Sequence, residues 1–112
     1  MFDLTGRTAL VTGASGGIGR AIATALSEAG AKVALSGTRE NVLEEVAGTL
    51  KGESAIVTCN LSDADAVDGL VGRAEAAIGP LDILVANAGI TRDKLLIQMK
   101  DDDWNDVLQV NL

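Results

Sequence analysis

A glycine-rich turn between two regular segments is the feature that most constrains how this chain folds. Residues 7–12 predict a short strand, four glycines follow within residues 13–19, and a helical pattern begins at Gly17. Glycine lets the backbone turn sharply and approach a neighbour closely, because it has no Cβ. The helix that follows directs unpaired N–H groups and the positive end of its dipole toward the turn, an arrangement that attracts anions. The order strand, turn, helix therefore predicts a cradle for a phosphate group.

The remainder of the chain repeats this alternation. Strands are predicted over residues 7–12, 32–36, 55–59 and 81–86, and helices over residues 17–29, 39–50, 62–78 and 101–112. Thr38 and Ser62 stand at expected N-caps, and Gly30 and Gly52 at expected C-terminal stops. The last helix opens with three aspartates, residues 101–103, whose negative charge suits a helix N-terminus.

Hydrophobic spacing also predicts which face of each helix is buried. In the first helix the predicted inward positions are Ile18, Ile22, Ala25, Leu26 and Ala29. In the last helix the spacing runs through Trp104, Val107, Leu108 and Asn111.

Apolar strands separated by amphipathic helices imply an α/β fold with a parallel sheet covered on both faces. Right-handed crossovers leave few topologies for such a sheet. The complete doubly wound dinucleotide fold has the strand order 3-2-1-4-5-6. We expect residues 1–112 to form one nucleotide-binding half-domain of this Rossmann-like fold, with four parallel strands in the order 3-2-1-4 and flanking helices.

Charge and cysteine content limit the remaining classes of function. A formal net charge of −7 and a pI near 4.3 argue against binding to nucleic acid or an anionic membrane, so any anion site must be local. Cys59 is the single cysteine and is interpreted as a core residue, and the absence of histidine leaves only carboxylates as metal ligands. No apolar run approaches the ~18 residues that a membrane span needs. We expect a cytoplasmic protein with no metal.

The end of the second strand predicts which dinucleotide is preferred. An acidic residue at this place accepts the ribose hydroxyls of NAD, whereas an arginine accommodates the 2′-phosphate of NADP. Here the chain continues with Thr38 and Arg39, and the first acid is Glu40. The sequence therefore favours NADP(H), with the alternative that Arg39 is simply a solvated residue in the first turn of a helix.

Two further turns are expected at the same edge of the sheet. Asn60 and Leu61 follow the third strand, and residues 87–89 (Asn-Ala-Gly) follow the fourth. Ligands of open α/β sheets bind at the carboxyl ends of the strands. Asn60 could hydrogen-bond an adenine edge and Gly89 permits a close backbone approach. Each alone is more often just turn chemistry, but together with the glycine turn they form one rim.

The motifs TGASGGIG over residues 12–19, Asn-Ala-Gly over 87–89 and Asn111, in this order and spacing, resemble the short-chain dehydrogenase/reductase family. Residues 90–112 look most like the 3-oxoacyl-[acyl-carrier-protein] reductases of fatty-acid synthesis. The resemblance covers essentially the whole chain. It implies an oxidoreductase that uses NADP(H).

The resemblance also implies roles for individual residues. The cofactor-binding set would be Gly13, Ala14, Ser15, Gly16, Gly17, Ile18 and Gly19 at the phosphates, Thr38 and Arg39 at the 2′-phosphate, Asn60 and Leu61 at the adenine, and Asn87, Ala88 and Gly89 toward the ribose. Asn111 matches the asparagine of the family's Asn-Ser-Tyr-Lys catalytic set. Two positions depart from the pattern: Gly16 replaces a common arginine, and Ala86 replaces a common asparagine.

The largest departure concerns the chemistry. The chain has no tyrosine, and the family's serine and Tyr-x-x-x-Lys segment would lie beyond Leu112. Ketone reduction by this route needs a hydroxyl near the carbonyl and a lysine that lowers its pKa. We therefore expect a chain that is catalytically incomplete alone, with Asn111 acting only in a completed fold. The alternative is a truncated, reconstructed or designed half-fold whose only properties are folding and self-association.

An incomplete sheet predicts an exposed edge. Residues 81–86 would lose the neighbour that a fifth strand provides, and an open apolar edge invites pairing with another chain. We expect a homodimer through strand 81–86 and helix 101–112, or completion by a missing C-terminal half.

Overall fold

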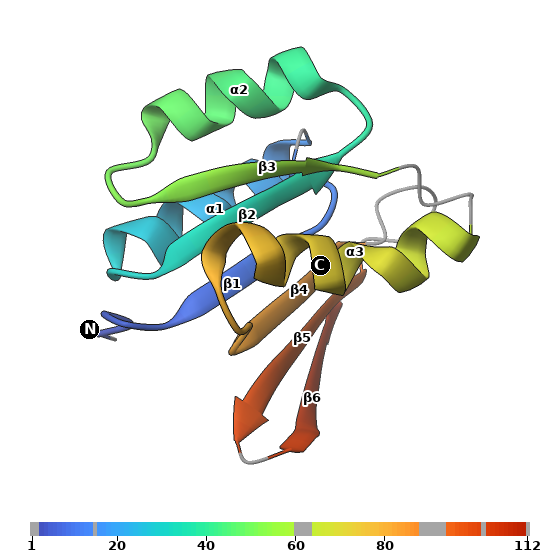
Figure 1. The fold of residues 1–112 in the computed structure, drawn as a ribbon. Helices are drawn as coiled ribbons and strands as arrows, with labels where there is room; N and C mark the ends of the chain where they lie inside the picture. The colour runs from blue at the N-terminus through green and yellow to red at the C-terminus, as the bar shows by residue number, and fades with distance from the viewer. Residues whose placement is uncertain (1–2, 15, 60–63, 88–93, 102, 112) are drawn as a thin grey trace.

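The computed structural model describes residues 3–14, 16–59, 64–87, 94–101 and 103–111. Its elements in chain order are β1 (Thr8–Val11), α1 (Gly17–Glu28), β2 (Lys32–Gly37), α2 (Glu40–Thr49), β3 (Ser54–Thr58), α3 (Ala64–Ile78), β4 (Ile83–Asn87), β5 (Lys94–Asp101) and β6 (Asp103–Asn111). Figure 1 shows one twisted sheet that these strands share, with the helices gathered around β1 to β4.

The parallel part of the sheet has the predicted order. β1 lies at the centre, with β2 and then β3 on one side and β4 on the other. Val11 is in register with Leu35 of β2 and with Val85 of β4, and all three pairings among β1 to β4 are parallel. The α/β class and the order 3-2-1-4 are therefore confirmed.

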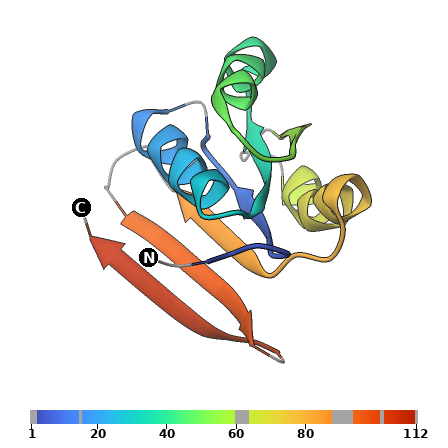
Figure 2. The ribbon, with the colours of Figure 1, turned by 90° about the vertical axis from the view of Figure 1, so that its left-hand side faces the viewer.

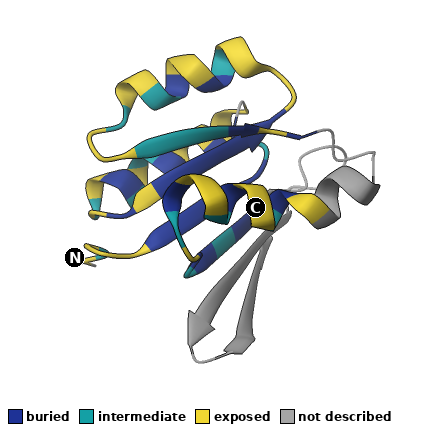
Figure 3. Ribbon diagram, in the orientation of Figure 1, coloured by how far each residue is buried: buried dark blue, intermediate teal, exposed yellow. Residues whose placement is uncertain are grey.

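The helices cover both faces of this sheet, as a doubly wound fold requires (Figure 2). On one face, α1 and α2 pack over strand residues that include Val11, Leu35 and Val85. On the other, α3 packs through Leu70, Ala74 and Ile78 against Leu10, Ala34, Val57 and Cys59. β1 is buried along its whole length and β2 is buried except for Lys32, so the core has two layers (Figure 3).

The buried face of α1 differs from the prediction. Its buried residues are Gly19, Ala23 and Ser27, while Ile22 and Leu26 are half-buried and Ile18 is 38% exposed. Small residues at the contact let the helix backbone approach the sheet more closely than a row of isoleucines would. Of the predicted inward residues, Ile22 and Leu26 do pack against the core, whereas Ile18 and Ala25 are exposed, because close packing selects side-chain size as well as polarity.

The start of α2 also differs from the prediction. Arg39 is the N-cap residue, and its carbonyl oxygen accepts hydrogen bonds from the N–H groups of Val42 and Leu43, both at 3.1 Å. The helix has no side-chain cap, so the expected N-cap role of Thr38 is wrong. The expected cap at Ser62 lies outside the described residues.

The largest difference follows β4. Residues 94–101 and 103–111 form an antiparallel hairpin, and β5 pairs with the outer edge of β4. The predicted helix over residues 101–112 is wrong. An unpaired strand leaves a row of N–H and C=O groups without partners, and adding β5 satisfies that row at the expense of local helical preference.

The hairpin also changes the expected site of self-association. β4 has a neighbour on both sides, and the outermost strand at this end of the sheet is β6. The argument for a homodimer through an open strand 81–86 and a helix 101–112 therefore fails, because β5 fills that edge.

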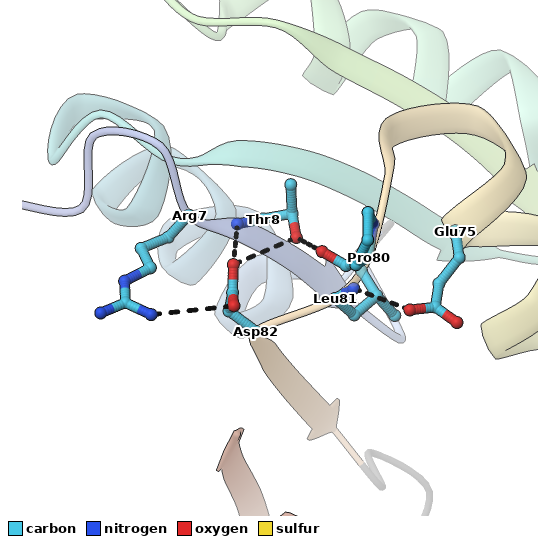
Figure 4. Close-up of polar contacts among 6 residues, drawn as sticks. All are labelled: Arg7, Thr8, Glu75, Pro80, Leu81 and Asp82. Atoms are coloured by element: carbon cyan, nitrogen blue, oxygen red, sulfur yellow. Dashed lines mark hydrogen bonds and ion pairs between the residues drawn. The ribbon is translucent and has the colours of Figure 1, made fainter. Parts of the chain in front are cut away.

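A polar cluster fastens the amino ends of β1 and β4 (Figure 4). The Thr8 N–H donates to Asp82 Oδ2 at 3.0 Å, and the Asp82 N–H donates back to the Thr8 carbonyl oxygen at 3.0 Å. The Thr8 hydroxyl donates to the carbonyl oxygen of Pro80, and Asp82 Oδ1 lies 3.7 Å from the Arg7 guanidinium. Glu75 on α3 accepts the Leu81 N–H at 2.9 Å. This edge of the sheet is closed by contacts within the protein.

Candidate nucleotide-binding site

The opposite edge of the sheet gathers the predicted site. The carboxyl ends of β1, β2, β3 and β4 meet there, because these strands are parallel and in register. Three backbone hydrogen bonds connect the chain as it leaves the strands: Thr12 N–H to Val85, Ala14 N–H to Ser36 and Cys59 N–H to Gly37. The first two bonds fix the start of the glycine turn between β4 and β2, and the third joins the end of β3 to the end of β2.

The glycine turn bends at Gly13 and enters α1 at Gly16. Gly13 has φ +64°, a left-handed conformation that favours glycine. The Gly16 N–H donates to the Gly13 carbonyl oxygen at 3.1 Å, and the Arg20 N–H donates to the Gly16 carbonyl oxygen at 2.9 Å. The second bond is the first full turn of α1, so the helix starts directly at the end of the strand-to-helix turn.

This start presents N–H groups that an α-helix cannot pair within itself, those of Gly17, Ile18 and Gly19. The N-cap makes no side-chain hydrogen bond, and the first turn contains no acidic residue. Oriented N–H groups and the positive helix end stabilise an anion at this place. The glycine turn therefore has the geometry of a phosphate-binding loop.

The four glycines of the turn have different structural demands. A Cβ at Gly19 would lie 2.3 Å from the Gly13 carbonyl oxygen, so this position must be glycine while α1 stays where it is. A Cβ at Gly16 would meet only the Gly13 oxygen, at 3.6 Å, and one at Gly17 would meet nothing within 4 Å. Packing thus requires glycine at Gly19 and the left-handed backbone favours it at Gly13, whereas Gly16 and Gly17 have room for a side chain.

Thr38 and Arg39 lie at the neighbouring strand end. Gly37 closes β2 and is buried, and both residues after it are exposed. Arg39 has extended backbone (φ −105°, ψ 94°) before α2 begins. The hydroxyl and guanidinium groups are thus carried by the loop beside the glycine turn, and the Ala14–Ser36 hydrogen bond ties this turn to β2.

The backbone N–H of Ala14, one of the residues predicted to contact the phosphates, is already hydrogen-bonded within the protein. The Ala14 N–H donates to Ser36, and Ala14 is fully buried, so its N–H serves to position the turn. Ser36 was not among the predicted site residues. The Ser36 carbonyl oxygen positions the glycine turn by accepting the Ala14 N–H. An apolar strand pattern gives no sequence signal for such a backbone contact.

Several predicted residues cannot be placed. Ser15, Asn60, Leu61, Ala88 and Gly89 lie outside the described residues. Asn87 ends β4 at the carboxyl edge. Asn111 ends β6 and is in register with Lys94, which starts β5, so the hairpin returns Asn111 to this same edge although its predicted helix is absent.

Other kinds of site find no support in the parts of the chain that the structure describes. No group of three or more metal-ligating side chains occurs among these residues. Within them, every fully buried side-chain nitrogen or oxygen has a hydrogen-bond partner. None of the helices in these ranges is long and apolar enough to cross a membrane. Cys59 is buried in the core, as predicted.

A glycine turn that opens a helix at the carboxyl edge of a 3-2-1-4 parallel sheet is the arrangement of one half of a doubly wound, Rossmann-like α/β fold. The family model for short chain dehydrogenases matches residues 7–112. The chain belongs to the short-chain dehydrogenase family.

Two named relatives match the whole of this chain. The chain is 54% identical over 112 residues to nodulation protein G of Rhizobium sp. strain N33, and 48% identical over 112 residues to the 3-oxoacyl-[acyl-carrier-protein] reductase of Rickettsia typhi. All of this chain is matched in both comparisons, but only 46% and 45% of those proteins. The chain therefore spans less than half the length of these relatives.

Solved structures agree on the fold. A 3-oxoacyl-(acyl-carrier-protein) reductase from Agrobacterium tumefaciens with NADP bound is 46% identical and superposes with a TM-score of 0.74, covering 80% of this chain and 35% of that one. A short-chain dehydrogenase/reductase from Mycobacterium marinum is 40% identical, with a TM-score of 0.73 over 80% of this chain and 37% of that one. The likeness is to an oxidoreductase fold of which this chain contains part.

Proposed function

We propose that this chain is the NADP(H)-binding part of a cytoplasmic oxidoreductase that resembles 3-oxoacyl-[acyl-carrier-protein] reductases. The observation that carries the proposal is the shared position of two groups at one sheet edge: the uncapped N-terminus of α1 with its glycine turn, and Thr38 with Arg39 at the end of β2. The first suits a pyrophosphate and the second suits a 2′-phosphate. The NADP bound to the Agrobacterium relative supports this choice of cofactor.

Each element of the site then has a task. Gly17, Ile18 and Gly19 donate backbone N–H groups to the pyrophosphate, while Gly13 and Gly19 keep turn and helix close enough for those groups to converge. Arg39 and Thr38 donate to the 2′-phosphate. Asn60 and Leu61 flank the adenine, and Ser15, Asn87, Ala88 and Gly89 complete the cofactor contacts. When bound, the cofactor supplies a hydride.

The chain by itself does not provide the proton chemistry of a ketone reduction. It contains no tyrosine and no histidine, so the hydroxyl that donates a proton must come from further chain that carries the serine and Tyr-x-x-x-Lys segment. Asn111 joins that set in a completed fold. We therefore propose reduction of a 3-oxoacyl thioester by the completed protein, as part of fatty-acid synthesis, and no reductase activity for the 112-residue chain.

A second candidate function is a half-fold without enzymatic purpose. The observation that favours it is the hairpin, because it covers the outer edge of β4 with a strand of the same chain. The two functions differ in one measurable property, the affinity for a dinucleotide.

Calorimetric titration of the chain with NADPH and NADH tests the proposal. We expect saturable binding of NADPH and at least about tenfold weaker binding of NADH, the ratio that one charge-assisted contact provides. Absence of NADPH binding up to millimolar concentration would contradict the proposed cofactor-binding function and favour the second candidate, a half-fold without enzymatic function. Reductase activity of the purified chain on a 3-oxoacyl thioester would contradict its catalytic incompleteness.

A further inference from the structure

Arg20 is an exposed cation near the start of α1 whose side chain has no task in the site described above. Within the described ranges, ion pairs join Arg7 to Asp82 and Lys32 to Glu53, and Arg20 takes part in neither. A guanidinium group is planar, always charged and carries five N–H donors, so it suits carboxylates and phosphates. Because no described carboxylate pairs with it, the Arg20 side chain is free to bind an anion.

The position of Ser27 shows which flank of α1 carries Arg20. The Ser27 hydroxyl oxygen accepts the N–H of Gly52 at 3.1 Å, in the loop that follows α2. This flank of α1 is therefore turned toward α2, on the face of the sheet that both helices cover (Figure 2). Arg20 precedes Ser27 by two helical turns, and residues at this spacing lie within about 20° of each other around the helix axis. Arg20 thus lies on the flank nearest α2, at the end of α1 where the glycine turn enters it.

The loop of Thr38 and Arg39 lies beside that end of α1. Both helices start at the carboxyl edge of the sheet, and these two exposed residues connect β2 to α2. A helical side chain leans toward the helix N-terminus and covers the preceding turn. For Arg20 that turn begins at Gly16, whose carbonyl oxygen accepts the Arg20 N–H at 2.9 Å and where even a Cβ would meet only one atom, at 3.6 Å. The Arg20 guanidinium therefore has room to reach the start of α1, on the side of Thr38 and Arg39.

Two guanidinium groups on neighbouring elements suit a terminal phosphate. A phosphate that is joined to a ligand by a single ester bond carries a charge of about −1.5 to −2 near pH 7 and exposes three acceptor oxygens. One guanidinium fork binds two acceptor oxygens, which leaves further acceptor sites for a second cation. Arg39 can approach from the start of α2 and Arg20 from α1. The backbone N–H groups of residues 17–19 remain free for the pyrophosphate.

We propose that Arg20 is a second residue that binds the 2′-phosphate of NADP(H), donating from α1 while Arg39 donates from the start of α2. This inference rests on the proposed function and defines the ligand class that the site selects, adenosine nucleotides with a 2′-phosphate. Arg20 sets affinity and specificity and takes no part in hydride or proton transfer. Its assignment comes from the side of α1 that faces α2, which the spacing of the glycines does not indicate.

The first experiment measures the affinity of Arg20→Ala by calorimetric titration. We expect NADPH binding to weaken about tenfold and NADH binding to stay unchanged, since one charge-assisted contact to the 2′-phosphate is lost. Adenosine 2′,5′-bisphosphate should lose affinity by the same factor as NADPH, because the contact does not involve the nicotinamide. Arg20→Lys should lose only about threefold, because lysine keeps the charge without the fork. Unchanged NADPH binding, or an equal loss for NADPH and NADH, would overturn the proposal.

Arg73→Ala is the matched control for the change in net charge. Arg73 is exposed on α3, which covers the other face of the sheet, and its removal should leave both affinities unchanged. A similar loss of NADPH affinity in Arg73→Ala would show that the net charge acts and not a contact, and would overturn the proposal. Both side chains are exposed, so the unfolding transitions of the two variants should match.

The second experiment tests whether Arg20 uses the space beside Gly16. Gly16→Arg places a guanidinium one turn earlier on the same flank of α1. In the Arg20→Ala background it should raise NADPH affinity about tenfold, whereas in the parent chain the gain should be about threefold, because Arg20 already binds there. Equal gains in the two backgrounds would show that positions 16 and 20 act at separate places, and would overturn the proposal.

Failure of this inference and failure of the proposed function give different results. A parent chain that prefers NADPH to NADH, together with an unchanged preference in Arg20→Ala, would refute the role of Arg20 and leave the proposed function intact. A parent chain that binds neither cofactor would refute the proposed function and the role of Arg20 with it.

Discussion

The two ends of the parallel strands, the amino edge and the carboxyl edge of the sheet, differ in how their polar groups are used. At the amino edge, Thr8 and Asp82 exchange backbone and side-chain hydrogen bonds, and Arg7 pairs with the same carboxylate. At the carboxyl edge, β1 leads into a glycine turn and into a helix whose start has no side-chain cap. The polar groups of the first edge bind one another, whereas at the second edge the first N–H groups of α1 have no side-chain cap and the residues that follow β2, Thr38 and Arg39, are exposed.

This difference separates the contacts that stabilise the protein from the groups that can bind a ligand. Contacts that close the amino edge hold β1 and β4 together, so their loss should lower stability and leave ligand affinity of the folded protein intact. Groups at the carboxyl edge should affect ligand affinity. Those that also pack α1 against the turn should affect stability as well. Substitutions at the two edges therefore test whether stability and binding are separate.

The largest effect is expected from Gly19→Ala, because its Cβ would lie 2.3 Å from a backbone oxygen. We expect a loss of unfolding free energy of about 3 kcal/mol, the upper part of the range for overpacking, together with loss of NADPH binding. Urea unfolding and calorimetry measure both. Gly17→Ala is the matched control: its Cβ meets nothing within 4 Å, and stability should stay equal or rise by up to about 1 kcal/mol. Equal stability of the two variants would contradict the close approach of α1.

The next effect is expected from Asp82→Ala at the amino edge. The Thr8 N–H, in a buried residue, would lose its carboxylate acceptor, and we expect a loss of about 1–2 kcal/mol in urea unfolding. Asp82→Asn keeps an acceptor and loses only the long ion pair with exposed Arg7, so it should cost less than about 1 kcal/mol. NADPH affinity of either variant below the melting transition should equal that of the parent chain; a changed affinity would show that the edges are not independent.

A smaller effect, confined to binding, is expected from Arg39→Ala. Removal of the guanidinium should weaken NADPH binding about tenfold and leave NADH binding unchanged, because only NADPH carries the 2′-phosphate. Competitive titration of the two cofactors measures the ratio. Arg7→Ala, another exposed arginine but at the amino edge, is the control and should change neither affinity. An equal loss of affinity for both cofactors would contradict a contact between Arg39 and the 2′-phosphate.

The smallest effect is a gain from Gly16→Arg. Gly16 has φ −87°, which any residue adopts, and its Cβ would make only an ordinary contact at 3.6 Å. A cation beside the turn should strengthen NADPH binding about threefold relative to NADH, as expected for an exposed charge–charge contact. Gly16→Ala has the same backbone without the charge and serves as the reference. Weaker NADPH binding than in Gly16→Ala would contradict an anion site at this face of the turn.

Sequence patterns correctly predicted those helices and strands whose local secondary-structure preference agrees with their tertiary surroundings. Four apolar strands, the helices of the first three crossovers and the glycine turn occur within a few residues of their predicted positions. Helix faces were harder to predict. Gly19, Ala23 and Ser27 form the contact of α1 because the helix lies close to the sheet, and hydrophobic spacing alone does not measure closeness.

The parallel sheet order and the glycine turn could be predicted from the sequence, because they follow from the alternation of apolar strands with helices and from residue types at fixed places. The glycine that packing requires, the hydrogen bond from the Ala14 N–H to Ser36 and the hairpin of residues 94–111 could not, because they depend on segments that are distant in the sequence. The reason is physical: these outcomes depend on what lies across space, and the unpaired edge of β4 outweighs the helical preference of the segment that covers it.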